Sequence, residues 1–81
     1  MSYESNHPTK QKLNMYRFME SRKNNGTISS RRLVNYSNKK GFRIIKVRGL
    51  RNCFGIENNR GNRIATFLVN KQNRINHWII D

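Results

Sequence analysis

The spacing of apolar residues changes at Gly41, and this change constrains the fold more than any other feature of the sequence. Before Gly41, apolar residues recur at the intervals of three and four that amphipathic helices require. After it, short segments rich in β-branched and aromatic residues alternate with turns of Asn and Gly. The sequence therefore predicts an α+β fold, with two N-terminal helices packed on a three- to four-stranded antiparallel β-meander.

The first predicted helix follows a flexible lead-in at residues 1–8. It begins at Thr9, which is suited to cap it, and ends near Lys23, before the Asn-Asn-Gly sequence at residues 24–26. One broad face of this helix is apolar and carries Met15, Tyr16, Phe18 and Met19. We expect this face to pack in the core of a single basic α+β domain at residues 9–81.

The second predicted helix spans residues 30–40 and has clear signals at both ends. Ser29 is a suitable N-cap, and Ile28 and Leu33 have the spacing of a hydrophobic staple around that cap. Two lysines in the last turn favour the negative end of the helix dipole, and Gly41 ends the helix.

Strands are predicted at residues 42–48, 51–57 and 63–69. The Asn- and Gly-rich turn at residues 58–62 joins the last two as a hairpin, because Asn and Gly tolerate a positive φ. Residues 74–80 are predicted as a fourth strand, with a short terminal helix as the alternative.

The charge of the chain is the strongest indication of its partner. Seventeen Lys and Arg face four Asp and Glu, which gives a formal net charge of +13 and a pI near 11.3. A small soluble domain usually carries a net charge of about 2 to 8 in magnitude, and a domain pI above about 9 is typical of nucleic-acid binding. We therefore predict a small basic protein that binds DNA or RNA, mainly through the phosphate backbone.

The predicted contacts are basic and amide side chains at four places: the start of the second helix, the first strand with its following turn, the hairpin tip and the last turn. The hairpin tip is the preferred contact loop, and Tyr36 and Trp78 are aromatic side chains open to base stacking. The predicted nucleic-acid-binding residues are Arg31, Arg32, Asn35, Arg43, Lys46, Arg48, Arg51, Arg60, Arg63, Lys71 and Arg74.

A helix-turn-helix is an alternative interpretation of residues 26–41. In it, Arg31, Arg32 and Asn35 lie on the exposed face of a recognition helix, and the hairpin acts as a wing.

Other classes of function find little support in the sequence. Cys53 is the only cysteine, so the chain forms no internal disulfide or Cys-based metal site. Its apolar runs are far shorter than the roughly 20 residues of a membrane span, and the polar N-terminus has no hydrophobic signal segment. The few carboxylates and histidines form no catalytic or metal-binding spacing. We expect a cytoplasmic protein with no catalytic residues, metal, cofactor or membrane partner, and association with the nucleoid or the ribosome is an alternative location.

The segment from Leu33 to Val69, with GFRIIKVRG before a hairpin, resembles two known families. It is similar to the helix–strand–strand–strand part of the double-stranded-RNA-binding fold and of HicA-type toxin ribonucleases. This resemblance implies an RNA-binding sheet and makes a toxin-like ribonuclease one alternative function. The toxins place a histidine just after the glycine that corresponds to Gly49, whereas this chain continues with Leu50 and Arg51.

A second alternative is a small regulatory protein, of the kind that viruses encode, which docks on an acidic surface of a host protein machine. Charge alone does not separate the two partners, because electrostatic steering acts on carboxylates as it does on phosphates.

Overall fold

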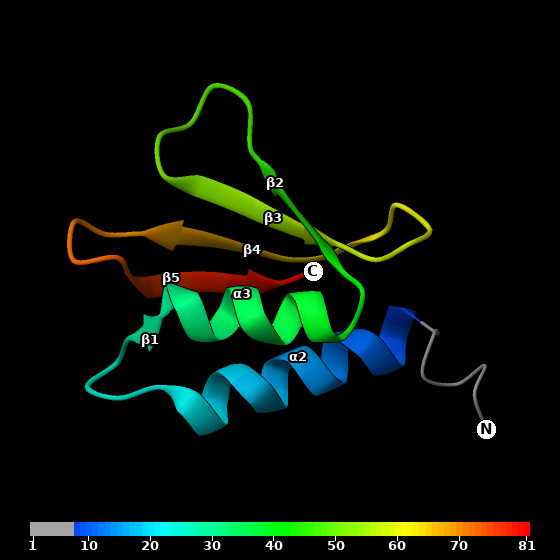
Figure 1. The fold of residues 1–81 in the computed structure, drawn as a ribbon, viewed down its shortest axis with the longest axis horizontal. Coiled ribbons are helices and arrows are strands. Elements are labelled where there is room, and N and C mark those ends of the chain that lie inside the picture. The colour runs from blue at the N-terminus through cyan, green and yellow to red at the C-terminus, as the bar shows by residue number, and fades with distance from the viewer. Residues whose placement is uncertain (1–7) are drawn as a thin grey trace.

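The computed structural model of the protein describes residues 8–81, which fold into two helices and a five-stranded antiparallel sheet (Figure 1). The lead-in predicted at residues 1–8 lies outside the described residues except for Pro8, which begins the first helix. In chain order the elements are α2 (Pro8–Arg22), β1 (Ile28–Ser29), α3 (Ser30–Lys39), β2 (Arg43–Lys46), β3 (Cys53–Glu57), β4 (Arg63–Val69) and β5 (Arg74–Ile80).

The α+β class is confirmed, but the predicted number of strands is wrong. The order of strands in the sheet is β1-β5-β4-β3-β2, so a meander of four strands gains β1 as an edge beside the C-terminal strand. Ile28 pairs with Ile75, and Ser29 with Arg74. A strand of two residues is too short to show a periodic pattern in the sequence. Its formation depends on pairing with β5, in which Arg74 lies 45 residues after its partner Ser29. The predicted fourth strand at residues 74–80 is confirmed, and its helical alternative is wrong.

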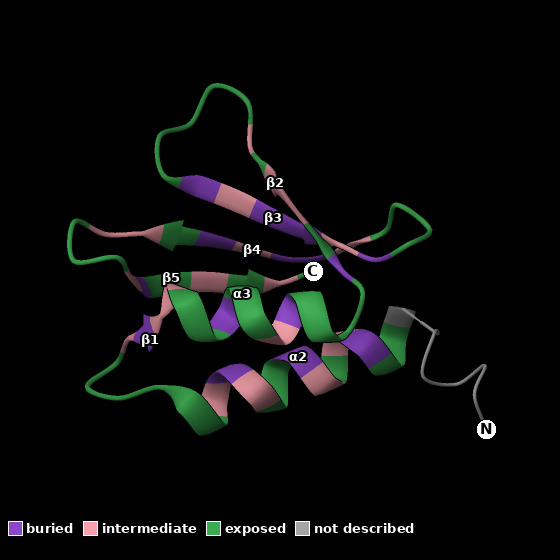
Figure 2. Ribbon diagram, in the orientation of Figure 1, coloured by how far each residue is buried: buried purple, intermediate pink, exposed green. Residues whose placement is uncertain are grey.

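Both helices lie on one face of the sheet, which we call the inner face. Helix α2 contacts β4 and β5, and α3 contacts the edge strands β1 and β2. The buried core lies between these layers, on the helix sides that face the sheet and along β3 and β4 (Figure 2). Its fully buried side chains include Met15, Leu33 and Ile56, each of which contributes about 1.5–3 kcal/mol relative to an exposed position.

The buried stripe of α2 is narrower than the predicted apolar face. Gln11, Met15 and Met19 follow one another at intervals of four and are buried, and Phe18 is partly buried beside them. Tyr16 points to solvent with 52% of its surface exposed. The polar Gln11 is buried in place of Tyr16. The Gln11 side chain accepts a hydrogen bond from Asn58 on the β3–β4 turn, which offsets the cost of burying it.

The ends of α3 agree closely with the prediction. Ser29 occupies the N-cap position in an extended conformation, although its side chain makes no capping hydrogen bond. Ile28 and Leu33, the predicted staple, are both fully buried. Gly41 follows the C-cap with a φ of 78°, a left-handed conformation that glycine adopts without steric cost.

A bulge in β4 moves one predicted site residue to the outer face of the sheet. The register between β3 and β4 shifts at Ile56 and Glu57, which leaves Ile64 without a direct partner. Arg63 then lies over Gly55, where a Cβ atom would be 2.7 Å from the guanidinium carbon. Glycine at position 55 therefore provides the space in which the Arg63 side chain lies.

Candidate functional site

Two recesses flank helix α3. An α-helix turns about 100° per residue, so residues four and seven apart share a flank. Arg32, Tyr36 and Lys39 therefore lie along the flank that faces α2. Ser30 and Val34 lie along the flank that faces the sheet. Arg31 is exposed on the ridge between the two flanks.

The first recess, between α2 and α3, is built on a pair of stacked aromatic rings. The rings of Phe18 and Tyr36 are 4.1 Å apart between centroids, with an angle of 19° between their planes. A cation lies over each ring: the Arg22 guanidinium is 5.8 Å from the centre of Phe18, and the Lys40 amine is 5.7 Å from the centre of Tyr36. Each such contact stabilises the cation by about 0.5–1 kcal/mol at an exposed site.

This interhelical recess has a volume of about 350 Å³ and is lined by Phe18, Arg22, Arg32, Asn35, Tyr36 and Lys39. None of the described residues that line it is acidic. The nearest carboxylate along α2, that of Glu20, is paired with Lys23 at 2.9 Å. The recess therefore combines an aromatic surface with unpaired positive charge, which is the combination that binds phosphates and stacked bases.

Burial raises the pKa of the Tyr36 phenol above its ordinary value, because desolvation disfavours the phenolate. Below about pH 9 the phenol is neutral in both the folded and the unfolded chain, and its titration has no effect on stability. Above that pH the unfolded chain loses the Tyr36 proton first, so the free energy of unfolding falls as the pH rises.

We therefore expect Tyr36→Phe to reduce the loss of stability between about pH 9 and 11. The measurement is urea unfolding of both proteins across this range. The two proteins differ only in the phenolic hydroxyl, so the difference between the curves reports on that group. Parallel curves would contradict the assignment.

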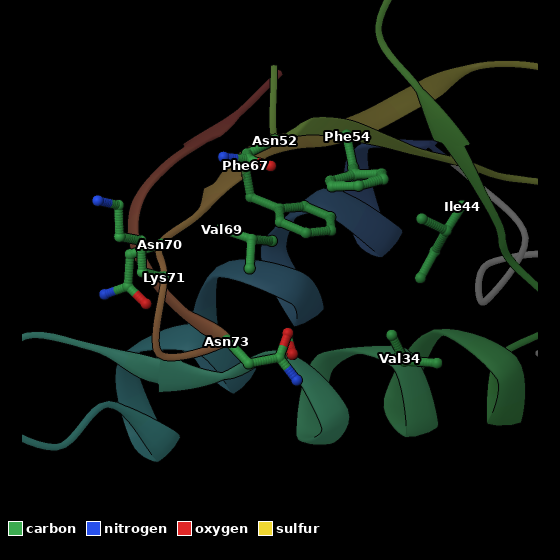
Figure 3. A pocket seen from close by; sticks show the side chains of 10 residues that line it. Val34, Ile44, Asn52, Phe54, Phe67, Val69, Asn70, Lys71 and Asn73 are labelled. Carbon is green, nitrogen blue, oxygen red and sulfur yellow. The ribbon is translucent and has the colours of Figure 1, made fainter.

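The second recess, the sheet–helix groove, lies between α3 and the inner face of the sheet and has a volume of about 420 Å³ (Figure 3). The rings of Phe54 and Phe67 lie on the sheet side and Val34 lies across from them on α3 (Figure 3). The complete lining comprises Ile44, Phe54, Phe67 and Val69 from the sheet, Ser30 and Val34 from α3, and Asn52, Asn70, Lys71 and Asn73 from the turns.

The structure brings five of the predicted site residues together around α3. Arg32 and Asn35 line the interhelical recess, and Arg31 lies on the adjacent ridge. Lys71 lines the sheet–helix groove, and the Lys46 amine is 5.6 Å from the centre of the Phe54 ring at the same groove.

Three of the predicted contact residues instead make side-chain contacts within the protein. Arg43 forms an ion pair with Glu57 at 3.0 Å across β2 and β3. Arg63 donates a hydrogen bond to Thr66 at 3.1 Å on the outer face. Arg74 donates one to Thr27 at 2.7 Å and so ties β5 to the α2–α3 connection.

The remaining predicted residues, Arg48, Arg51 and Arg60, are exposed in the β2–β3 and β3–β4 connections and line neither recess. The hairpin tip, preferred as a contact loop, is partly structural. Asn58 is buried, with only 2% of its surface exposed. Its carboxamide oxygen accepts hydrogen bonds from the backbone N–H groups of Arg60 and Asn62, each at 2.9 Å. Only the outer residues of this turn remain available to a ligand.

The helix-turn-helix interpretation does not match the geometry. The connection between α2 and α3 contains strand β1, and the two helices run in opposite directions (Figure 1). A helix-turn-helix instead joins helices that cross at about 90–120° through a turn of three or four residues.

Three residues that line the interhelical recess are absent from the predicted binding residues: Phe18, Arg22 and Lys39. The sequence places Phe18 on the core face of its helix and Lys39 at the negative end of the helix dipole, and it marks Arg22 only as one of the basic residues of the first helix. The spacing of Arg32, Tyr36 and Lys39 was a usable signal, because it places two cations and an aromatic ring on one flank of a helix. The pairing of that flank with Phe18 and Arg22 required the fold.

The outer face of the sheet differs in character from the helical side. Leu50, Leu68 and Ile79 are exposed there around a hollow of about 330 Å³, whose lining also includes His77 and Trp78. Within residues 8–81, no helix is long and apolar enough to span a membrane.

Comparison with known proteins found no matching family model, no matching curated protein and no matching solved structure. The helix–strand–strand–strand order of the resemblance noted above is present from α3 to β4.

Proposed function

We propose that this protein binds nucleic acid through the phosphate backbone, with the interhelical recess and the ridge of α3 as its contact surface. The observation that carries the proposal is the cluster of Arg22, Arg32, Lys39 and Lys40 around the stacked Phe18 and Tyr36 rings, with no acidic side chain in the lining. Folding these cations against one another costs electrostatic free energy, which an anionic ligand offsets on binding.

The distribution of ion pairs supports this choice of surface. Within residues 8–81 the ion pairs are Lys23 with Glu20 and Arg43 with Glu57, so the acids of α2 and β3 neutralise cations outside the recess. The side chains of Arg31 and Arg32 make no ion pair or hydrogen bond within the described chain. Their guanidinium groups are therefore available for bidentate contacts with phosphate.

The salt dependence of binding tests the proposal. If Arg22, Arg31, Arg32, Lys39 and Lys40 neutralise five phosphates, the logarithm of the affinity for duplex DNA should fall with that of the salt concentration at a slope of roughly −4.5. A fluorescence titration with a labelled duplex at several salt concentrations gives this slope. Affinity that does not change with salt, or no binding at low salt, would exclude the function.

We expect the double substitution Arg31→Ala and Arg32→Ala to flatten that slope by one to two units and to weaken binding roughly 10- to 50-fold at about 0.1 M salt. The loss should be equal for all sequences, because phosphate contacts carry no sequence information. Arg48→Ala with Arg51→Ala removes the same charge from the β2–β3 connection, outside the lining of the interhelical recess, and serves as the matched control. A change in sequence preference would instead assign base contacts to Arg31 and Arg32.

A second candidate function is docking on an acidic protein surface, and the outer face of the sheet favours it. Leu50, Leu68 and Ile79 expose apolar area there that nucleic acid binding does not use, and exposed apolar patches often mark protein contacts. A protein complex that survives nuclease treatment and high salt would favour this function, and its absence would leave nucleic acid as the partner.

A further inference from the structure

We infer that the sheet–helix groove receives an unstacked base, so that the protein prefers single-stranded nucleic acid to a duplex. This inference rests on the proposed function, because it concerns the same ligand, but it assigns a separate recess to the base. It depends on the shape, the apolar walls and the polar rim of the groove, none of which the phosphate contacts of the interhelical recess require.

The walls of the groove are suited to a flat aromatic ligand. Phe54 packs on the buried ring of Phe67, with ring centroids 5.7 Å apart and an angle of 24° between their planes. Phe54 is only partly buried, and Val34 faces it from α3 with 38% of its surface exposed. A base in the groove would thus contact apolar surface on both of its faces. Its volume of about 420 Å³ lies in the range of ligand pockets, roughly 300–1,000 Å³.

The rim supplies the polar groups that a base edge needs. Asn52 and Asn73 are exposed at turns with left-handed backbones, with φ values of 56° and 62°. No hydrogen bond within the described chain uses either side-chain amide; the backbone carbonyls of both residues are occupied by Val69 and Ser30. An amide carries both donors and an acceptor, which match the mixed edges of nucleobases.

Positive charge borders the groove on two sides. Lys71 lines one end, and Lys46 lies over the Phe54 ring at the β2 side. Within residues 8–81, no acidic side chain lines the groove. Because the groove and the interhelical recess lie on opposite flanks of α3, a strand that crosses the ridge at Arg31 would reach both. A duplex keeps its bases paired, so it would use the ridge and the recess alone.

Val34→Phe tests the inference because it fills the groove from an exposed helix position and leaves the charge unchanged. Leu68→Phe is the matched control: Leu68 is 39% exposed, close to the 38% of Val34, but lies on the outer face. The double substitution Asn52→Gly and Asn73→Gly removes the rim amides and preserves the left-handed backbones. The probes are a labelled single strand, a duplex of the same length, and a strand of the same length without bases.

We expect the wild-type protein to bind the single strand about ten-fold more tightly than the strand without bases, since stacking contributes about 1–3 kcal/mol per base. Val34→Phe should remove this preference and leave duplex affinity within about two-fold, and the glycine pair should reduce it. Leu68→Phe should change neither affinity. Circular dichroism and thermal unfolding of each variant confirm that it is folded.

The outcomes separate the two proposals. Equal binding of the strands with and without bases, or full preference in Val34→Phe, would overturn the base site while duplex binding still supports the proposed function. A preference for bases that is abolished by Val34→Phe but insensitive to substitutions at Arg22, Arg32, Lys39 and Lys40 would support the groove and contradict the recess. No binding of any probe at low salt would overturn both.

Discussion

Replacing Arg22, Arg32, Lys39 and Lys40 together with glutamine should lower the affinity for duplex DNA on the order of 10³-fold at about 0.1 M salt. Each phosphate contact changes the salt slope by about 0.9, so the loss of four contacts should reduce the magnitude of the slope from roughly 4.5 to roughly 1. The effect is large because these cations surround one pair of aromatic rings and act on the same stretch of backbone. Titration of a labelled duplex at several salt concentrations measures both quantities.

The matched control carries the same loss of charge at distant positions: Lys10, Arg48, Arg51 and Arg60, all exposed, are replaced with glutamine. If the recess is the contact surface, this control should retain most of the affinity and most of the slope. Equal losses in the two variants would mean that binding depends on net charge alone and would remove the recess from the proposal.

Asn58→Ala should destabilise the fold by about 3 kcal/mol, because one side chain holds both the β3–β4 turn and helix α2. Its amide nitrogen donates to the Gln11 carboxamide oxygen at 2.8 Å, and its oxygen accepts the N–H groups of Arg60 and Asn62. Gln11 is only 7% exposed, so its oxygen would lose its partner inside the protein. Chemical denaturation gives the free energy, and the melting temperature should fall by more than about 10 °C.

Asn59→Ala, at the exposed next position of the same turn, is the control and should change the free energy of unfolding by less than about 0.5 kcal/mol. A double-mutant cycle with Gln11→Ala separates the helix contact from the turn contacts. The two substitutions should be strongly non-additive, and strict additivity would contradict the coupling between α2 and the turn.

Asn58 illustrates which features a sequence predicts and which it does not. Its place in an Asn-Asn-Arg-Gly-Asn run correctly indicates a turn. Nothing local indicates that the side chain is buried, because its partner Gln11 is 47 residues away in the chain. The hydrogen bond between Gln11 and Asn58 explains why both polar side chains are buried. This bond forms only when the fold brings α2 and the β3–β4 turn together.

The predicted binding residues also fall into two groups: those that lie at the recess and those that bond within the protein. Sequence reasoning identified Arg31, Arg32 and Asn35 from their position at the start of a helix, and these lie at or beside the interhelical recess. Arg63 and Arg74 were predicted from their charge and from their places at the hairpin tip and the last turn. A bulge moves Arg63 over Gly55, and the pairing of β1 with β5 brings Arg74 to Thr27. Charge predicts the kind of ligand, whereas the register of a sheet decides which charges remain available for it.

By itself, the sequence determined the α+β class, the ends of α3, the positions of β4 and β5 and the excess of positive charge, because periodicity, capping residues and composition act over a few neighbouring residues. Only the tertiary structure decided the edge strand β1, the tether between Asn58 and Gln11, and the stack of Phe18 on Tyr36. Each of these joins residues that are distant in the chain, and such contacts form only when the burial of the shared core offsets the entropy of closing the loop between them.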